Sequence, residues 1–150
     1  FSLDIGFVRL ERVPRTLEIK TILKENFCLV LPKNHLINED NFISLAQFKE
    51  ESFILFDVKY STSYHEKVMQ IFDDCGFSPL SSHNTIHSSS IFKLVENNFG
   101  ISIVPKSLAQ KRGHNIKFIE LVSISQKTTL SVIWNKKNTN PILNDVLRLL

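Results

Sequence analysis

The segment HSSSIFKLVENNFGISIVPKSLA, residues 87–109, contains the most informative pattern in the chain. Apolar residues recur at helical spacing after the three serines and predict a helix from about Ser89 to Asn98. Gly100 ends this helix, and the apolar run 101–104, stopped by Pro105, predicts a buried strand. A helix that leads directly into a buried strand is a unit of an α/β fold.

The same alternation extends outward from this segment in both directions. Apolar runs predict buried strands at 3–8, 27–31, 53–56, 116–121 and 130–134, with a weaker candidate at 80–86. Helices are expected at 45–48, 62–75 and 106–112, and after Pro141. Because strands alternate with helices, the sequence predicts an α/β fold with mostly parallel sheets. Ligands of such sheets bind beyond the carboxyl ends of the strands, where helix N-termini also point.

Composition restricts the class of protein further. The 150 residues include 43% hydrophobic residues and 12 Phe, enough for a packed core and too apolar for a disordered chain. The net charge is +3, and the Lys and Arg residues are scattered along the sequence. This pattern is not typical of a dedicated nucleic-acid surface. No apolar run is long enough to span a membrane, so no membrane partner is expected. Cys28 and Cys75 are interpreted as free thiols in a reducing, cytoplasmic compartment.

Catalytic signatures are poor. The four glycines form no phosphate-binding or nucleophile motif, and the five histidines are dispersed without metal-ligand spacing. The sequence therefore predicts a protein that is not an enzyme and has no metal site and no cofactor.

Two expected helix starts are rich in hydroxyl groups, at residues 60–63 and 87–90. A helix N-terminus presents unpaired N–H groups and partial positive charge, so it can hold a carboxylate or phosphate. The alternative is ordinary N-capping by serine, and Ser63 with Glu66 has the spacing of a capping box. Local sequence leaves both interpretations open.

Five segments together resemble the effector-binding domain of LysR-type transcriptional regulators. They are LDIGFVR (3–9), FCLVLPKNHLI (27–37), LAQFKEESFILF (45–56), the segment 87–109, and TTLSVIWNKK (128–137). The resemblance implies two α/β lobes like those of type II periplasmic binding proteins. Residues 1–31 and 130–150 would form part of an incomplete first lobe, and residues 32–129 the second. The DNA-binding helix-turn-helix of this family is not in the chain.

The resemblance also implies a ligand site between the lobes. Its expected residues are Val8, Arg9, Asp57, Tyr60, Ser61, His87, Ser88, Ser89, Val104 and Trp134. Arg9 is also compatible with a surface charge, and Val104 and Trp134 with plain core packing. Hydroxyls, helix ends and one arginine favour a carboxylate or another small anion.

The function implied is that of a cytoplasmic domain that senses a small effector and modulates DNA binding and transcription. Contact with DNA would be made only through the absent helix-turn-helix. Such domains form homodimers or tetramers, and the helix 62–75 is expected at the interface, with Met69 exposed on its outer side. The alternative is an exported solute-binding protein of the same two-lobe fold.

Overall fold

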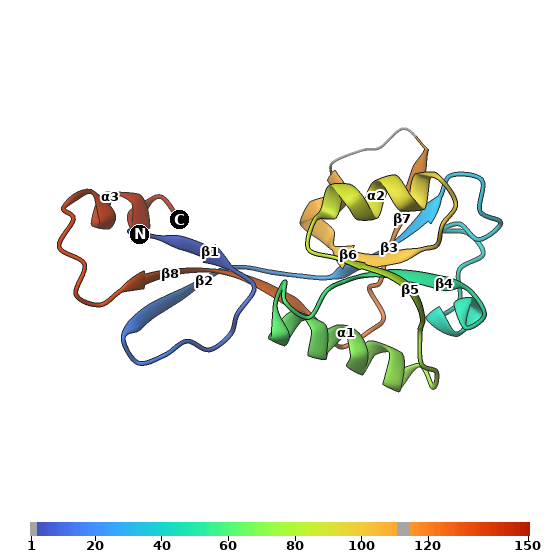
Figure 1. Ribbon diagram of the computed structural model, residues 1–150, viewed down its shortest axis with the longest axis horizontal. Helices are drawn as coiled ribbons and strands as arrows, with labels where there is room; N and C mark the ends of the chain where they lie inside the picture. Colours follow the sequence, from blue (N-terminus) through green and yellow to red (C-terminus); the bar gives the residue numbers. More distant parts are fainter. Residues whose placement is uncertain (1–2, 111–114) are drawn as a thin grey trace. The chain divides into compact units, whose positions relative to one another are not determined.

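The computed structural model describes residues 3–110 and 115–150, which separate into two compact units (Figure 1). The first unit contains the described residues up to Lys24 together with Thr129–Leu150. The second unit is the continuous segment Glu25–Thr128. The chain therefore enters and leaves the second unit once each.

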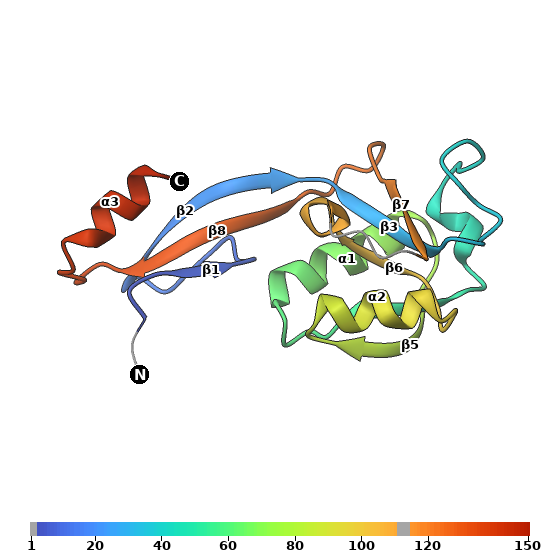
Figure 2. The same cartoon turned by 90° about the horizontal axis from the view of Figure 1, so that it is seen from above.

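The first unit is a three-stranded sheet with one helix. Its strands are β1 (Gly6–Val8), β2 (Leu17–Glu25) and β8 (Thr128–Asn135), with β8 in the centre (Figure 2). β1 runs antiparallel to β8, with Gly6 opposite Ile133. The helix α3 (Ile142–Arg148) follows Pro141, close to its predicted start.

Two predictions for this unit need correction. The strand expected to be buried at 3–8 is short and is not buried. Phe7 within β1 is 56% exposed, and Leu3, which precedes β1, is 69% exposed. β2 was not predicted, because its sequence LEIKTILKE contains no long continuous apolar run. Its partial alternation of apolar with charged residues is the pattern of a half-buried strand and was missed. The strands expected at 3–8 and 130–134 are the shorter β1 and the longer β8.

The second unit is built around β3 (Phe27–Pro32), whose six residues are all buried. β6 (Ser102–Pro105) and β7 (Ile116–Glu120) flank it, and both pair with it in antiparallel direction. The parallel pair is β4 (Ser52–Phe56) with β5 (Leu80–Thr85). The expectation of mostly parallel sheets was therefore wrong, because an apolar run shows that a strand is covered on both faces but not its direction.

Two helices cover the strands of the second unit from opposite sides in Figure 1. α1 (Thr62–Asp74) buries Tyr64, Val68, Ile71 and Phe72, and α2 (Ser88–Glu96) buries Ile91 and Val95. Short 3-10 turns lie at η1 (Leu45–Phe48) and η2 (Lys106–Gln110). The remainder of the helix predicted at 106–112, residues 111 and 112, lies outside the described residues.

The start of α1 is capped by a serine side chain. Ser61 is the N-cap of α1, and its Oγ accepts a hydrogen bond from the Tyr64 N–H at 3.2 Å. The capping box predicted from Ser63 and Glu66 was therefore wrong, because the N-cap is Ser61 and the helix begins two residues earlier than that pairing requires.

The border between the units also differs from the prediction. The whole of β3 belongs to the second unit, because its ladder partners β6 and β7 lie there. The chain changes unit after Lys24, not after Leu31, and returns after Thr128, one residue before the predicted position. In the described part of the chain, no helix has both the length and the apolar character that a membrane span requires.

Candidate functional site

A cavity of about 210 Å³ lies in the second unit at the start of α2. We call it the α2 N-terminal pocket. Its lining residues come from the end of β4, the turn before α1, the start of α2 and η2: Phe56, Tyr60, Ile86, His87, Ser88, Ser89 and Leu108. Because β4 and β5 are parallel, their carboxyl ends meet at this edge, which is where α/β sheets place ligand sites.

The start of α2 forms the polar side of this pocket. His87 is the N-cap residue, and its side chain makes no capping hydrogen bond. The His87 carbonyl accepts from the N–H groups of Ser90 and Ile91, at 3.1 and 3.3 Å. The N–H groups of Ser88 and Ser89 belong to the first turn, which has no acceptors within the helix. The pocket is thus lined by a helix end with positive potential.

Ordinary N-capping by serine is not what the structure shows here. No serine side chain caps α2. The His87 N–H, which precedes the first turn, donates to the Thr85 hydroxyl at 3.2 Å. Among the described residues, the hydroxyls of Ser88 and Ser89 have no hydrogen-bond partner. They are therefore available to a ligand.

Aromatic side chains form the opposite wall. The rings of Phe56 and Tyr60 are stacked, with centroids 4.2 Å apart and planes inclined by 17°. Tyr64 packs edge-on against both rings, and its hydroxyl donates to the Ile103 carbonyl at 3.2 Å. This anchored cluster presents an apolar surface opposite the donors of α2.

None of the seven residues that line the pocket is an aspartate or a glutamate, so no carboxylate among them repels an anion. Open N–H groups, two hydroxyls and an imidazole beside an apolar wall suit a small molecule with an anionic head and an apolar body. Within the described residues, no group of three or more His, Cys, Asp or Glu side chains could hold a metal ion.

The structure brings together four of the ten predicted site residues: Tyr60, His87, Ser88 and Ser89. Asp57 and Ser61 lie next to the pocket but serve the local backbone. The Asp57 carboxylate accepts from the Lys59 N–H at 2.9 Å, and Ser61 caps α1. Val104 is fully buried in β6 opposite Cys28, which matches the core-packing alternative.

The other three predicted site residues belong to the first unit. Val8 ends β1, Arg9 follows it, and Trp134 lies half-buried in β8. Their role in ligand binding remains a prediction.

The sequence analysis missed three apolar lining residues, Phe56, Ile86 and Leu108. Their residue types give the same signal as core residues. Position alone could have found Phe56, because it is the last apolar residue of a predicted strand. Leu108 comes from a turn whose approach to α2 is set by tertiary packing.

The buried thiol of Cys28 is a structural group. Burial, reinforced by the nearby Glu120 carboxylate, raises the pKa of the Cys28 thiol to about 11. The thiol therefore stays protonated near neutral pH and is not a nucleophile there.

Comparison with known proteins identifies the class to which this arrangement belongs. The family model described as "LysR substrate binding domain" matches residues 1–150. The chain belongs to this family, in agreement with the resemblance seen in the sequence.

Relatives and solved structures agree with this assignment. The chain is 26% identical over 153 residues to the HTH-type transcriptional regulator TtuA of Agrobacterium vitis, covering 99% of the chain and 50% of the relative. It is 25% identical over 148 residues to the HTH-type transcriptional regulator CatR of Pseudomonas putida, covering 99% and 51%. The chain thus spans about half the length of these relatives.

The fold is that of the solved LysR-type regulators. The crystal structure of CbnR, a LysR family transcriptional regulator, matches with a TM-score of 0.83 at 24% identity, over 97% of this chain and 50% of CbnR. The BenM effector binding domain with its effector benzoate matches with a TM-score of 0.76 at 22% identity, over 98% and 68%. The predicted α/β fold of the type II periplasmic-binding-protein kind is confirmed.

Proposed function

We propose that this chain is the small-molecule effector-sensing domain of a LysR-type transcriptional regulator. The observation that carries this proposal is the α2 N-terminal pocket, where open helix donors face an aromatic wall in a chain that the family model covers throughout. Tyr60, His87, Ser88 and Ser89 are the residues that we assign to ligand binding.

The ligand is a small carboxylate or another small anion. Its anionic group accepts hydrogen bonds from the first-turn N–H groups of α2 and from the hydroxyls of Ser88 and Ser89. Its apolar part contacts the stacked rings of Phe56 and Tyr60. The assignment of Val8, Arg9 and Trp134 to the same ligand rests on the family resemblance, as does that of the two units to the two lobes.

The proposed signal is a change of conformation that is coupled to effector binding. An effector shifts a conformational equilibrium only by its different affinity for the two states, so the proposed response is a hinge change that alters DNA binding elsewhere in the regulator. DNA contact, assembly into dimers or tetramers and action in the cytoplasm are parts of this proposal. No catalytic role is proposed, and the relatives are named as transcriptional regulators.

One expectation about the dimer interface needs correction. Met69 on α1 is half-buried and packs against the core of the second unit. It therefore does not provide the exposed apolar surface that was expected to support an interface on this helix.

Isothermal titration of the 150-residue chain with small carboxylates, benzoate among them, tests the site. We expect the double variant Ser88→Ala/Ser89→Ala to fold normally and to bind at least about tenfold more weakly, because it loses hydrogen bonds to a charged group. The matched control Ser123→Ala/Ser125→Ala replaces two exposed serines outside the pocket and should bind like the parent chain. Equal affinities for both double variants would show that the serines do not hold the ligand.

The regulator part of the proposal has its own test in the coding sequence upstream of Phe1. A helix-turn-helix followed by a long helix is expected there. A secretion leader would contradict a DNA-linked role and favour an exported binding protein.

A further inference from the structure

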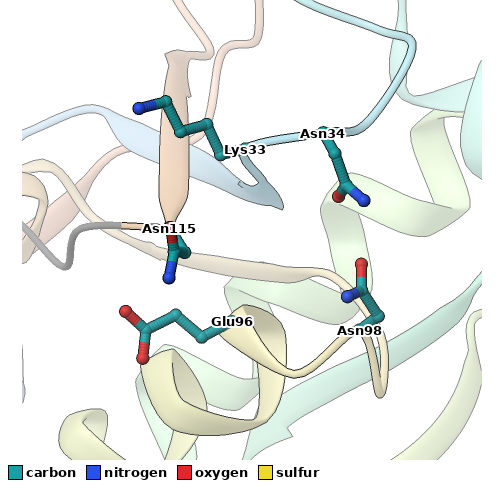
Figure 3. A pocket seen from close by; sticks show the side chains of 5 residues that line it. All are labelled: Lys33, Asn34, Glu96, Asn98 and Asn115. Atoms are coloured by element: carbon teal, nitrogen blue, oxygen red, sulfur yellow. The ribbon is translucent and has the colours of Figure 1, made fainter.

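A second pocket lies at the opposite end of α2 and has a different chemical character (Figure 3). We call it the α2 C-terminal pocket. Its volume is about 350 Å³, and every lining residue carries a charge or a carboxamide: Lys33, Asn34, Glu96, Asn98 and Asn115. It has no residue in common with the α2 N-terminal pocket.

The helix end fixes one side of this pocket. The N–H groups of Asn98 and Phe99 donate to the carbonyls of Val95 and Leu94, both at 3.0 Å, and this pair of bonds closes α2. Asn98 has a φ of 62°, a left-handed conformation in which glycine is the usual residue. Asparagine is the next most common residue there, so Asn98 suits the turn and also presents a carboxamide to the pocket.

The turn after β3 fixes the other side. The His35 N–H donates to the Pro32 carbonyl at 3.0 Å, which closes the turn that carries Lys33 and Asn34. The Lys33 N–H donates to the Asn115 carbonyl at 2.9 Å and so ties this turn to the residue before β7. The three segments that present the polar side chains are therefore held by backbone hydrogen bonds.

The pocket contains two opposite charges, and one of them is unfavourably placed. Glu96 is the last residue of α2, where the helix dipole is negative and an acidic side chain is unfavourable. Among the described residues, neither the Glu96 carboxylate nor the Lys33 ammonium has a hydrogen bond or an ion pair, and the two are not paired with each other. A cation beside Glu96 would offset its repulsion by the helix end, and the solvent-exposed Lys33 ammonium can contact an anion.

The five side chains come from three segments of the chain and line one pocket. In Figure 3 Asn115 lies between Lys33 and Glu96, while the carboxamides of Asn34 and Asn98 point towards each other. Opposite charges that are separated by carboxamide groups match a small molecule with an ammonium and a carboxylate group.

We propose that the α2 C-terminal pocket binds a small zwitterion of the α-amino acid class. Its ammonium group lies against Glu96 and the carbonyls at the end of α2, and its carboxylate lies against Lys33. The carboxamides of Asn34, Asn98 and Asn115 donate to and accept from its remaining polar groups. This site is independent of the effector pocket assigned above.

Amide and side-chain NMR spectra of the 150-residue chain, recorded with the common α-amino acids added one at a time, test the proposal. We expect at least one amino acid to shift the side-chain carboxamide signals of Asn98 and Asn115. Analogues that carry only one of the two charged groups should bind at least about tenfold more weakly than the amino acid itself. For L-alanine these analogues are propionate, which has only the carboxylate, and ethylamine, which has only the ammonium group.

Variants of the lining residues test whether the amino acid binds in this pocket. Glu96→Gln, Lys33→Gln and Asn98→Gly should each weaken binding, and the glycine variant retains the turn because it suits the left-handed position. The controls Glu39→Gln and Lys49→Gln change exposed charges outside the pocket and should have no effect, and Ser88→Ala/Ser89→Ala should bind the amino acid normally. No shift with any amino acid, or equal binding by Glu96→Gln and Glu39→Gln, would overturn the proposal.

Discussion

Gly100 joins α2 to β6 at a point where the backbones of two strands nearly touch. A Cβ added at Gly100 would lie 2.6 Å from the Ser52 carbonyl oxygen and 3.2 Å from its carbon. That oxygen cannot move away freely, because it accepts a hydrogen bond from the Ile101 N–H at 2.9 Å. Ile54 adds a second tie, since its N–H donates to the Ile101 carbonyl at 2.8 Å. Gly100→Ala must therefore push β4 away from the start of β6.

We expect Gly100→Ala to lower the free energy of unfolding by about 3 kcal/mol, at the upper end for an overpacked site, because the atoms that collide are backbone atoms. The matched control is Gly76→Ala. Gly76 has a φ of 80° but no atom within 4 Å of the added Cβ, so only the conformational penalty of about 1 kcal/mol applies.

Urea denaturation followed by far-ultraviolet circular dichroism measures both changes. Fluorescence of Trp134 is less suitable, because this residue lies in β8 of the first unit and both glycines lie in the second. Equal destabilisation by Gly100→Ala and Gly76→Ala would refute the steric argument.

Three further outcomes follow from local contacts. Ser61→Ala should lower the free energy of unfolding by about 1 kcal/mol, because Ser61 caps α1, whereas Ser88→Ala should change it by less than about 0.5 kcal/mol; urea denaturation compares the two. Cys28 should resist alkylation in the folded chain near neutral pH, since burial raises the pKa of its thiol to about 11, and mass spectrometry of the labelled peptides should find Cys28 modified only after unfolding. The carboxyl of Glu120 has a pKa below its usual value of 4.5, first because Asn26 donates to it at 2.7 Å and then because Lys106 does at 2.9 Å. The unfolded chain therefore binds a proton at Glu120 more tightly than the folded chain does. The stability that Glu120 contributes is present above its usual pKa and is lost as the pH falls below that value. Urea denaturation of Glu120→Gln should show a smaller decrease in the free energy of unfolding on acidification than the parent chain shows.

The sequence was sufficient for elements whose apolar pattern alone decides whether they form a strand or a helix. The apolar run of β3 and the helical spacing of α1 and α2 predicted those elements within two residues at each end. The sequence was insufficient where pairing decides. Nothing in the residues of β3 distinguishes a parallel from an antiparallel neighbour, and nothing in those of β2 shows that it pairs with β8 from the far end of the chain.

The site shows the same division. The hydroxyl-rich start of α2 could be recognised as a possible anion site because helix ends have that property wherever they occur. The identity of the N-cap residue could not be recognised, since His87 takes that position without a side-chain bond and leaves the serines uncommitted. The α2 C-terminal pocket gave no sequence signal, because its residues come from three separate segments that only the fold brings together.

The central claim is that the start of α2 holds the anionic group of the effector. The most direct measurement is a pairwise titration of the chain with carboxylates and their neutral amides, such as benzoate and benzamide. These pairs have nearly the same shape but differ in charge. If the claim is correct, a carboxylate that binds should do so at least about tenfold more tightly than its amide, with its largest NMR shifts at the backbone amides of Ser88 and Ser89. Equal binding of acid and amide, or shifts that avoid these two residues, would contradict it.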